Sequence, residues 1–251
     1  MKNYLVFRMY GPLASWGSVA VGEVRPSFSH PSKSAILGLV AAAMGYRRDE
    51  EEKHLELAKS FQFAVKVWNR GVLLRDYHTV QVPPQGKQPF ATRKEQLRTK
   101  LDLKTILSSR DYYQDALYDV CLTNLSDTVS LEEIATSLQQ PKFPLYLGRK
   151  SCVLAAPLFP ESIAAETLFL AFEKYESKQQ TRFAEKGVTY FYQTQKLQGK
   201  FVEYFWEGES EKQSQKILSR RDGVLSRSRW QFSERKEFYR SETQEVADVF
   251  K

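Results

Sequence analysis

The segment Gly148-Arg149-Lys150-Ser151 combines several groups that bind phosphate. It brings together backbone N–H groups, two cations and a hydroxyl, and a corner of this composition can wrap a phosphate. A β-turn with solvated charges explains the same residues, and the motif alone does not separate the two interpretations. The segment also lacks the GxxxxGK[ST] spacing of a P-loop, so nucleotide hydrolysis is disfavoured.

A second polar group lies at the start of a helix that the sequence predicts from Ser32 to Gly45. A helix N-terminus presents unpaired N–H groups and a partial positive charge, which suit an anion such as a phosphate. Ser32 or Ser34 can cap this end, and Lys33 adds a point charge beside it.

Arg75, Tyr77 and His78 lie close together in a strand-like stretch from Val72 to Val82. Side chains alternate across a strand, so Arg75 and Tyr77 share one face and His78 points to the other. Tyr77 can stack on a base and Arg75 can hold a phosphate. Alternatively, Tyr77 lies in the core and Arg75 pairs with an acid such as Asp76.

Cations and aromatic residues are interleaved near the C-terminus, where residues 212–240 hold nine Lys or Arg against three acids. Arg227 and Arg229 share a face if this segment is an extended strand, and Trp230 and Phe232 lie beside them. An exposed basic edge strand, which discourages aggregation, is the alternative. We favour contact with a polyanion, because the basic segments would otherwise repel one another without a partner.

The spacings of a metal site or a hydrolase site are absent from the sequence. The three histidines, His30, His54 and His78, form no HxxxH or HExxH pair, which argues against zinc. GxSxG is also absent. Cys121 and Cys152 have no CxxC neighbour and are predicted to be reduced, buried thiols of a cytoplasmic protein. We therefore expect no metal and no cofactor.

The 251 residues carry a net charge of +7, and the charge is clustered. Residues 86–110 hold seven cations against two acids, whereas residues 49–56 are acidic. Clustered basic charge suggests a polyanionic partner, although it also serves solubility. No apolar run approaches the roughly 20 residues that span a bilayer. No signal-peptide cleavage site follows the N-terminus, so neither a membrane nor secretion is expected.

Residues 1–160 are predicted to follow the order strand, helix, strand, strand, helix, strand. That order is the ferredoxin-like, RRM-type split βαβ plan, so we predict an α+β fold. Trp16, in a Gly-flanked loop, is expected to lie in the core. The predicted elements are strand 2–10, helices 32–45 and 50–60, strand 61–68, strand-like residues 112–122, a capped helix 130–140 and a brief strand 145–148. Residues 161–251 are predicted to form a small β-rich subdomain, with a helix to about residue 173 and strands near 188–193 and 200–206.

The stretch from Val72 to Asn124 is predicted to form a long hairpin-like insertion, placed at about residues 75–120, with a cationic tip. Few large apolar residues occur at the tip, residues 85–104, so it cannot bury enough surface to order itself and is predicted to be mobile. Arg93, Lys94 and Arg98 lie about one helical turn apart and could follow a nucleic-acid backbone.

Several blocks of the sequence resemble the type I-E members of the fifth CRISPR-associated (Cas) family, which belongs to the RAMP superfamily. The blocks are GPLASWG, HPSKSAILGLVAAAMG followed by RRDEEE, LRDYHTV and YLGRKSC. They follow one another up to about Pro157, and the resemblance resumes near RWQFSERKEFY.

The resemblance implies an RRM-like body with a thumb that binds CRISPR RNA (crRNA) in antiviral defence. Such members grip the 5′ handle of the crRNA and cap the backbone of the Cascade surveillance complex. They lie beside its backbone subunit and its large subunit, and they meet target DNA through the assembled complex. The predicted RNA-binding residues are Arg25, His30, Ser32, Lys33, Arg75, Tyr77, His78, Arg93, Lys94, Arg98, Arg149, Lys150, Ser151, Arg227 and Arg229.

An enzyme is the main alternative. Relatives of another subtype cut precursor crRNA without metal, using a tyrosine, a lysine and a histidine as acid–base groups. Tyr77 and His78, with Lys87 or Lys150, could serve here. However, LRDYHTV resembles the type I-E version, in which a separate subunit cuts the RNA, so a non-catalytic protein is predicted.

Overall fold

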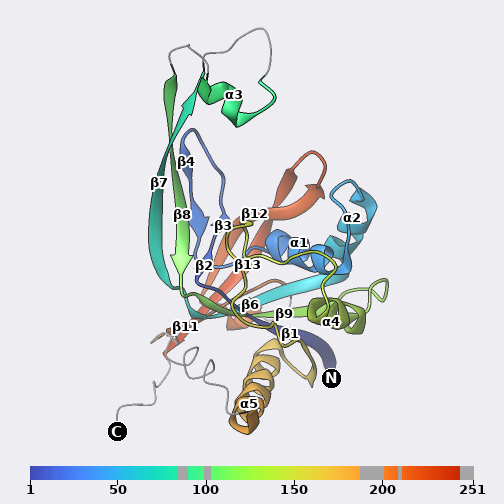
Figure 1. Cartoon of the computed structure of the whole chain (residues 1–251). Helices are drawn as coiled ribbons and strands as arrows, with labels where there is room; N and C mark the ends of the chain where they lie inside the picture. Colours follow the sequence, from blue (N-terminus) through green and yellow to red (C-terminus); the bar gives the residue numbers. More distant parts are fainter. Residues whose placement is uncertain (84–89, 99–102, 187–200, 209–210, 244–251) are drawn as a thin grey trace.

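The computed structural model describes residues 1–83, 90–98, 103–186, 201–208 and 211–243, which form a mixed α/β fold rich in sheet (Figure 1). Seven strands form the main sheet, in the order β10-β1-β9-β6-β11-β13-β12, and all neighbours in it are antiparallel. These strands are β1 (Lys2–Tyr10), β6 (Phe61–Asn69), β9 (Leu117–Asn124), β10 (Glu161–Ala165), β11 (Phe201–Trp206), β12 (Lys216–Ser226) and β13 (Gln231–Thr243).

Helices cover both faces of this sheet. Figure 1 shows α1 (Lys33–Met44), α2 (Glu51–Ser60) and α4 (Leu131–Gln139) on one side, and α5 (Leu168–Lys186) on the other. The alternation of β1 explains the two cores, because Leu5 and Phe7 belong to the cluster that includes α1 and α4. Tyr4 and Val6 belong to the cluster that includes Phe172 of α5.

Strand β6 differs from the half-buried strand that its alternation predicted. Phe63 and Val65 pack on the α1 side, as their spacing suggests. Ala64 and Trp68 are also buried, in the cluster on the α5 side. The second face is covered because α5 packs there, and a strand's own sequence does not reveal such a partner.

Both predicted helix caps are confirmed. The Ser32 hydroxyl accepts a hydrogen bond from the Ala35 N–H at 3.1 Å at the start of α1. Gly45 ends this helix with a φ of 81°, the left-handed conformation that glycine adopts without strain. Ser130 caps α4 by accepting from the Glu133 N–H at 3.1 Å.

Two strand predictions are corrected. The stretch 112–122 is two strands, because a turn with a positive φ of 56° at Asp115 separates the end of β8 (Lys104–Gln114) from β9. The stretch 145–148 makes only an isolated bridge, between Tyr146 and Val153. The edge of the sheet is instead β10, in a stretch predicted as helix, because these residues pair with the free edge of β1.

The C-terminal strands extend the main sheet beyond β6. β11 pairs with β6 and with β13, so one sheet runs across the predicted boundary at residue 160. The division into two subdomains stays a prediction. The predicted strand at 200–206 is confirmed as β11, whereas residues 188–193 lie outside the described part of the chain.

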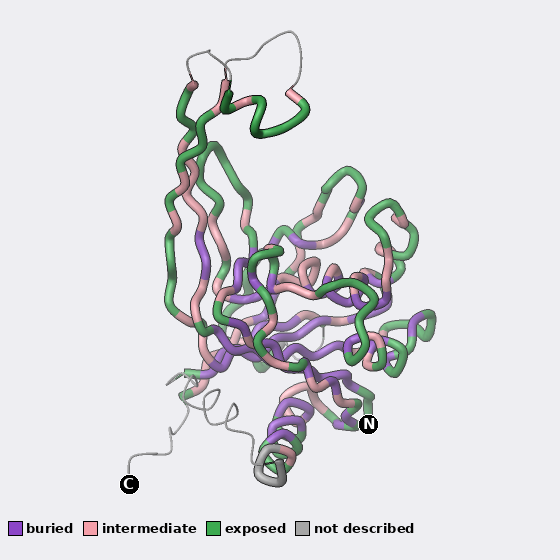
Figure 2. The backbone as a smooth tube through the Cα atoms, viewed as in Figure 1, coloured by how far each residue is buried: buried purple, intermediate pink, exposed green. Residues whose placement is uncertain are grey.

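A long two-stranded ribbon projects from the body, and we call it the arm (Figure 1). It consists of β7 (Val72–Val82) and β8, paired from Val72↔Gln114 to Val82↔Lys104. Most of the arm is exposed or half-buried (Figure 2). The tip carries α3 (Arg93–Arg98), and residues 85–89 and 99–102 of the predicted mobile segment lie outside the described residues.

Short strands join the arm to the body. β8 pairs with β2 (Leu13–Ala14) and with β4 (Val24–Arg25), while β3 (Trp16–Gly17) pairs with β5 (Ser27–Phe28). Trp16 is buried against Tyr118, with ring centroids 5.8 Å apart, so its predicted place in the core is confirmed. Cys121 and Cys152 are buried, unbridged thiols, as expected.

Candidate nucleic-acid interface

Five cations come from the base of the arm, on both faces of the ribbon, and from the corner beside it, and we call this set the arm-base patch. Its members are Arg25, Arg75, Arg110, Arg149 and Lys150. The parallel pairing of β4 with β8 sets Arg25 opposite Arg110. Arg149 crosses from the 148–151 corner, because its Nη2 donates to the Arg25 carbonyl at 3.2 Å. Its guanidinium also lies 4.8 Å from the ring centroid of Tyr112 in β8.

Arg149 has an unsatisfied donor at this junction. Its Nη1 is buried and, among the described residues, has no hydrogen-bond partner. A guanidinium carries five N–H donors, and leaving a buried one unpaired costs free energy. This atom is shielded from solvent, so it does not itself offer a contact to a ligand. Among the described residues no carboxylate forms an ion pair with Arg149, so its charge can still attract an anion.

Gly148 allows the corner to press against the body. Its φ of 88° is left-handed, and an added Cβ would lie 1.9 Å from the Ser15 carbonyl oxygen. The Ser15 N–H donates to the Leu147 carbonyl at 3.0 Å, which fixes the corner beside β3. Lys150 and Ser151 remain exposed, so their side chains face solvent next to Arg149.

On β7, the ligand-binding and the structural interpretations of Arg75 and Tyr77 are each correct in part. Arg75 is paired with an acid, donating from Nε and Nη2 to the two oxygens of Asp111 at 2.8 and 3.0 Å. That partner is Asp111 of β8 and not Asp76. The hydrogen bond from Arg75 lowers the pKa of Asp111, although burial opposes the shift. The Arg75 side chain is still 60% exposed, so it can also contact a ligand.

Tyr77 is 61% exposed, so the alternative that placed it in the core is wrong. His78 lies on the other face of the strand, where it pairs with Asp76. The two side chains therefore face different surroundings, as the strand alternation predicted.

The predicted phosphate site at the start of α1 is corrected, because protein carboxylates occupy it. The Lys33 N–H donates to Asp222 at 2.8 Å, and the Lys33 amine donates to Glu207 at 2.5 Å. Asp222 belongs to β12, so the carboxylate that meets this helix end comes from the distant C-terminal hairpin. Ser32 acts as the cap, with its hydroxyl engaged by the Ala35 N–H.

His30 is also removed from the predicted RNA-contacting set, because it is buried. Its ring stacks on Phe205 with centroids 3.6 Å apart, and Arg220 donates both to its Nε2 and to its carbonyl oxygen. Burial above all lowers the pKa of His30 to about 4, although Glu237 opposes the shift. A neutral His30 thus belongs to the internal network that ties β12 and β13 to α1.

Arg227 and Arg229 do not share a strand face, which corrects that expectation. They lie in the turn between β12 and β13, where the Arg229 N–H donates to the Ser226 hydroxyl at 3.1 Å. Arg93, Lys94 and Arg98 are exposed on α3 at the arm tip, far along the ribbon from the arm-base patch. The structure therefore divides the predicted set among the arm base, the arm tip and this turn.

Sequence reasoning missed Arg110 and Arg48. Arg110 joins the arm-base patch only through the pairing of β8 with the two-residue strand β4, which has no periodic signal. Arg48 precedes an acidic stretch, which concealed its place near Trp230, 5.7 Å from the ring centroid.

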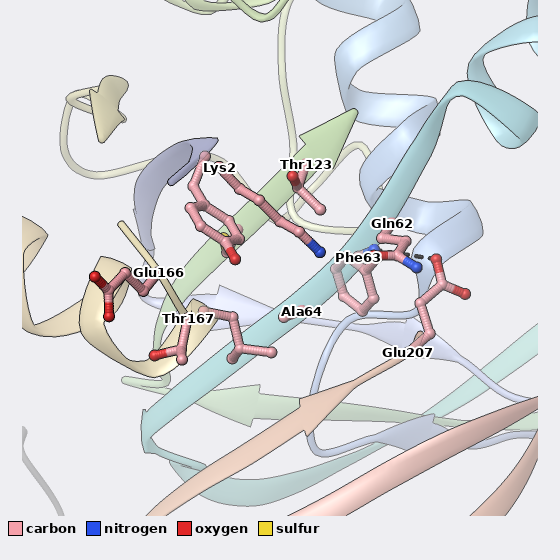
Figure 3. Close-up of a pocket in the computed structure, with 11 residues that line it drawn as sticks. Lys2, Gln62, Phe63, Ala64, Thr123, Glu166, Thr167 and Glu207 are labelled. Carbon is pink, nitrogen blue, oxygen red and sulfur yellow. Dashed lines mark hydrogen bonds between the residues drawn. The ribbon is translucent and has the colours of Figure 1, made fainter. Parts of the chain in front are cut away.

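A small pocket lies apart from these cations, between β1, β6, β9 and the start of α5 (Figure 3). Lys2 extends into it, and Glu207 at its rim accepts from the Phe63 N–H at 3.0 Å. No histidine is among the residues that line this pocket, so the wall offers no imidazole base. Within the described residues, no group of three or more His, Cys, Asp or Glu could hold a metal ion.

No described helix is long and apolar enough to cross a membrane.

Comparison with known proteins shows the family of this chain. The sequence profile of the family described as CRISPR-associated protein (Cas_Cas5) matches residues 4–237. The CRISPR system Cascade subunit CasD of Escherichia coli (strain K12) is 32% identical over 198 residues, which cover 75% of this chain and 84% of that protein.

Two solved structures share the fold. One, titled as the crystal structure of a Cas protein, is 24% identical with a TM-score of 0.59, and the match covers 96% of this chain and 94% of that chain. The other is a chain of a CRISPR RNA-guided surveillance complex, 21% identical with a TM-score of 0.59, covering 96% and 89%.

Proposed function

The chain belongs to the CRISPR-associated Cas5 family, and from this premise we propose that it is a non-catalytic, crRNA-binding subunit of a type I-E Cascade complex. In this proposal it grips the 5′ handle of the crRNA and caps the backbone of the complex in antiviral defence. Its partners are the crRNA, the backbone subunit and the large subunit, and it meets target DNA through the assembly. The 32% identity to the Cascade subunit CasD supports this role.

We assign the fold to the ferredoxin-like plan of RNA-binding RAMP proteins. The strand order β10-β1-β9-β6 supports the assignment, since it reads 4-1-3-2 for four strands connected as βαββαβ. The arm then takes the part of the thumb, inserted between β6 and β9. The contact of Arg149 with Tyr112 of β8 keeps the corner at 148–151 beside the base of the arm, where one RNA strand could contact both.

The charge of Arg149, which no described carboxylate neutralises, is the observation that carries the RNA-binding proposal. The Arg149 guanidinium lies beside the Arg25 carbonyl and the ring of Tyr112. Arg25 is paired with Arg110 in the register of β4 and β8, so a phosphate at this corner would have further cations nearby. Arg75 keeps an exposed guanidinium beside an exposed Tyr77, which together suit a phosphate and a stacked base.

A double variant, Arg149→Ala with Lys150→Ala, tests the proposal in filter binding to crRNA that contains the handle. Each single-strand phosphate contact contributes roughly 0.7 to the slope of log K against log salt, so the slope should flatten by about 0.7 to 1.4. Lys174→Ala with Lys178→Ala is a matched control, because α5 lies on the opposite face of the sheet (Figure 1). Unchanged affinity and slope in the first variant would contradict the proposal.

The arm tip is proposed to lie between RNA and a neighbouring subunit. The cations Arg93, Lys94 and Arg98 on the exposed α3 support this role. Removing residues 85–104 should leave the melting temperature of the free protein nearly unchanged and impair assembly with crRNA and the backbone subunit. Normal assembly of the deleted protein would contradict this role.

Cleavage of precursor crRNA is the alternative function, and the arrangement of β7 counts against it. Tyr77 and His78 point to opposite faces, so they cannot flank one 2′-OH without a change of conformation. Lys87, another candidate, lies outside the described residues. Incubation of the protein with precursor crRNA in EDTA should give no specific product. A discrete product that His78→Ala abolishes would favour the enzyme.

A further inference from the structure

Arg48, Arg227 and Trp230 form a second cationic surface, which we call the indole patch. It lies where the β12–β13 turn meets the connection between α1 and α2, apart from the arm (Figure 1). The Ser228 hydroxyl donates to Glu51 of α2, which ties the turn to that helix. The patch is thus supported from two elements that are distant in sequence.

Trp230 is held outward at the end of the turn. Its side chain is 59% exposed, and its φ of 57° is left-handed, which is unusual for a bulky residue. The ring packs edge-on against Phe232, with centroids 5.6 Å apart. The left-handed backbone at Trp230 is therefore strained. Burial of the side chain does not offset this strain, because most of the ring faces solvent.

Two guanidiniums flank this ring without a neutralising partner. The Cζ atoms of Arg227 and Arg48 lie 4.9 and 5.7 Å from the indole centroid. In the described part of the chain, no ion pair joins either arginine to a carboxylate. Burial and then the charge of Arg48 lower the pKa of Arg227, so an anion beside it would be stabilising. Glu51, close to the turn, is already engaged by Ser228.

Helix α1 makes room for one of these cations. A Cβ added at Gly38 would lie 2.7 Å from Nη2 of Arg227, and among the described residues outside its own helix turn only atoms of that guanidinium lie within 4 Å. Glycine in the middle of a helix is destabilising relative to alanine. The absence of a side chain at Gly38 lets Arg227 lie across the helix beside Trp230, which explains why a glycine stands at this position.

We propose that the indole patch binds single-stranded nucleic acid, with a base stacked on Trp230 and the flanking phosphates held by Arg48 and Arg227. Every base has a π-face, and aromatic residues beside arginines are the usual platform for single strands. The inference rests on the proposed function to the extent that the chain binds nucleic acid, but it concerns a different surface. Exposed Trp and Arg also occur at protein interfaces. The two unneutralised guanidiniums favour phosphate here.

Intrinsic fluorescence provides a direct test, because Trp230 is the exposed member of four tryptophans. Trp16, Trp68 and Trp206 are buried, so quenching by a ligand or by acrylamide reports mainly on Trp230. The whole chain is titrated with a ten-residue oligouridylate, with the matching oligothymidylate, and with an abasic sugar-phosphate oligomer of the same length. Either base-bearing oligomer should quench the indole and protect it from acrylamide, whereas the abasic oligomer should not. The base-bearing oligomer that binds more tightly shows whether the patch prefers RNA or DNA.

Anisotropy of a labelled oligomer measures the contribution of the ring and the cations. In a background of Arg149→Ala and Lys150→Ala, Trp230→Ala should weaken binding about 5- to 140-fold, whereas Trp230→Tyr should keep most of the affinity. Arg48→Ala, at an exposed position outside helices and strands, should flatten the salt slope by about 0.7. It provides a readout even if Trp230→Ala folds poorly.

The inference and the proposed function can fail separately. No quenching by either base-bearing oligomer, or an affinity equal to that of the Arg149→Ala and Lys150→Ala background after adding either Trp230→Ala or Arg48→Ala, would overturn the nucleic-acid role of the indole patch. It would leave the surface as a candidate for a protein partner. If handle-containing crRNA still loses affinity with Arg149→Ala and Lys150→Ala, the proposed function stands.

Discussion

Replacing Gly38 with alanine should stabilise the protein and weaken its binding to nucleic acid. In the middle of α1, glycine costs about 0.5–1 kcal/mol relative to alanine. The new Cβ would lie 2.7 Å from Nη2 of Arg227 and 3.8 Å from its Cζ, and no other described atom outside the helix's own turn lies within 4 Å. A guanidinium ends a flexible side chain, so it should move while the helix stays in place.

Moving Arg227 should cost little, since burial is the main cause that lowers its pKa and exposure to water would restore its solvation. The free energy of unfolding should therefore rise by about 0.5–1 kcal/mol, and Tm by roughly 1–4 °C for a chain of this size. The displaced cation no longer reaches the phosphate beside Trp230, so the salt slope should flatten by about 0.7.

Urea denaturation and salt-dependent anisotropy with the labelled oligouridylate measure the two effects on one preparation. In an Arg227→Ala background, Gly38→Ala should still stabilise the helix but should leave binding unchanged, because the group it displaces is already absent. A lower Tm of the Gly38→Ala protein would show that helix α1, and not the Arg227 side chain, moves to accommodate the new methyl group. A wild-type salt slope would show that Arg227 does not contact the ligand.

Three further predictions concern stability. Gly148→Ala should destabilise the protein by about 1–3 kcal/mol in urea denaturation, because the residue has a φ of 88° and its Cβ would meet the Ser15 carbonyl at 1.9 Å; unchanged stability would show that the corner adapts. Buried His30 has a pKa of about 4, so between pH 6.5 and 4 this histidine takes up a proton in the unfolded state but not in the folded state. The free energy of unfolding should therefore fall by up to about 3 kcal/mol as the pH drops through this window. His30→Gln should lessen the fall, and equal pH slopes for the two proteins would refute the assignment. Arg8→Met should lower the free energy of unfolding by about 3–5 kcal/mol, because Arg8 donates to buried Asp119 at 2.7 and 2.9 Å and its loss leaves a buried charge unpaired. Adding Asp119→Leu should recover part of this loss, and full additivity of the two changes would argue against the pairing.

The local elements could be predicted closely from the sequence. β1 and β7 have the predicted bounds, and α1 begins after Ser32 and ends before Gly45 as the capping residues indicated. These features depend on neighbouring residues, on hydroxyl caps, on glycine and on period-two alternation, so a single sequence contains their cause. The missed strand β10 exists because β1 offers a free edge, which local propensity does not encode.

The position of the exposed cations was only partly predictable. Composition and charge clustering indicated a polyanionic partner, and the 148–151 corner was recognised from its residue types. Lys33 and Arg149 looked equivalent in sequence, yet Lys33 is neutralised by Glu207, whereas no described carboxylate forms an ion pair with Arg149. Which cation stays available for a ligand depends on where distant carboxylates lie in the fold, and for Lys33 the residue that follows β11 decides it.

The sequence by itself determined the family, the chain's own basic charge and the order of most elements, because these are properties of residue types and their neighbours. The tertiary structure decided which residues share a surface. It placed Arg25 opposite Arg110, buried His30 beneath the C-terminal strands and brought Arg48 to Trp230. These contacts join residues far apart in the chain, and their geometry follows from sheet pairing and helix packing. No local pattern records those interactions.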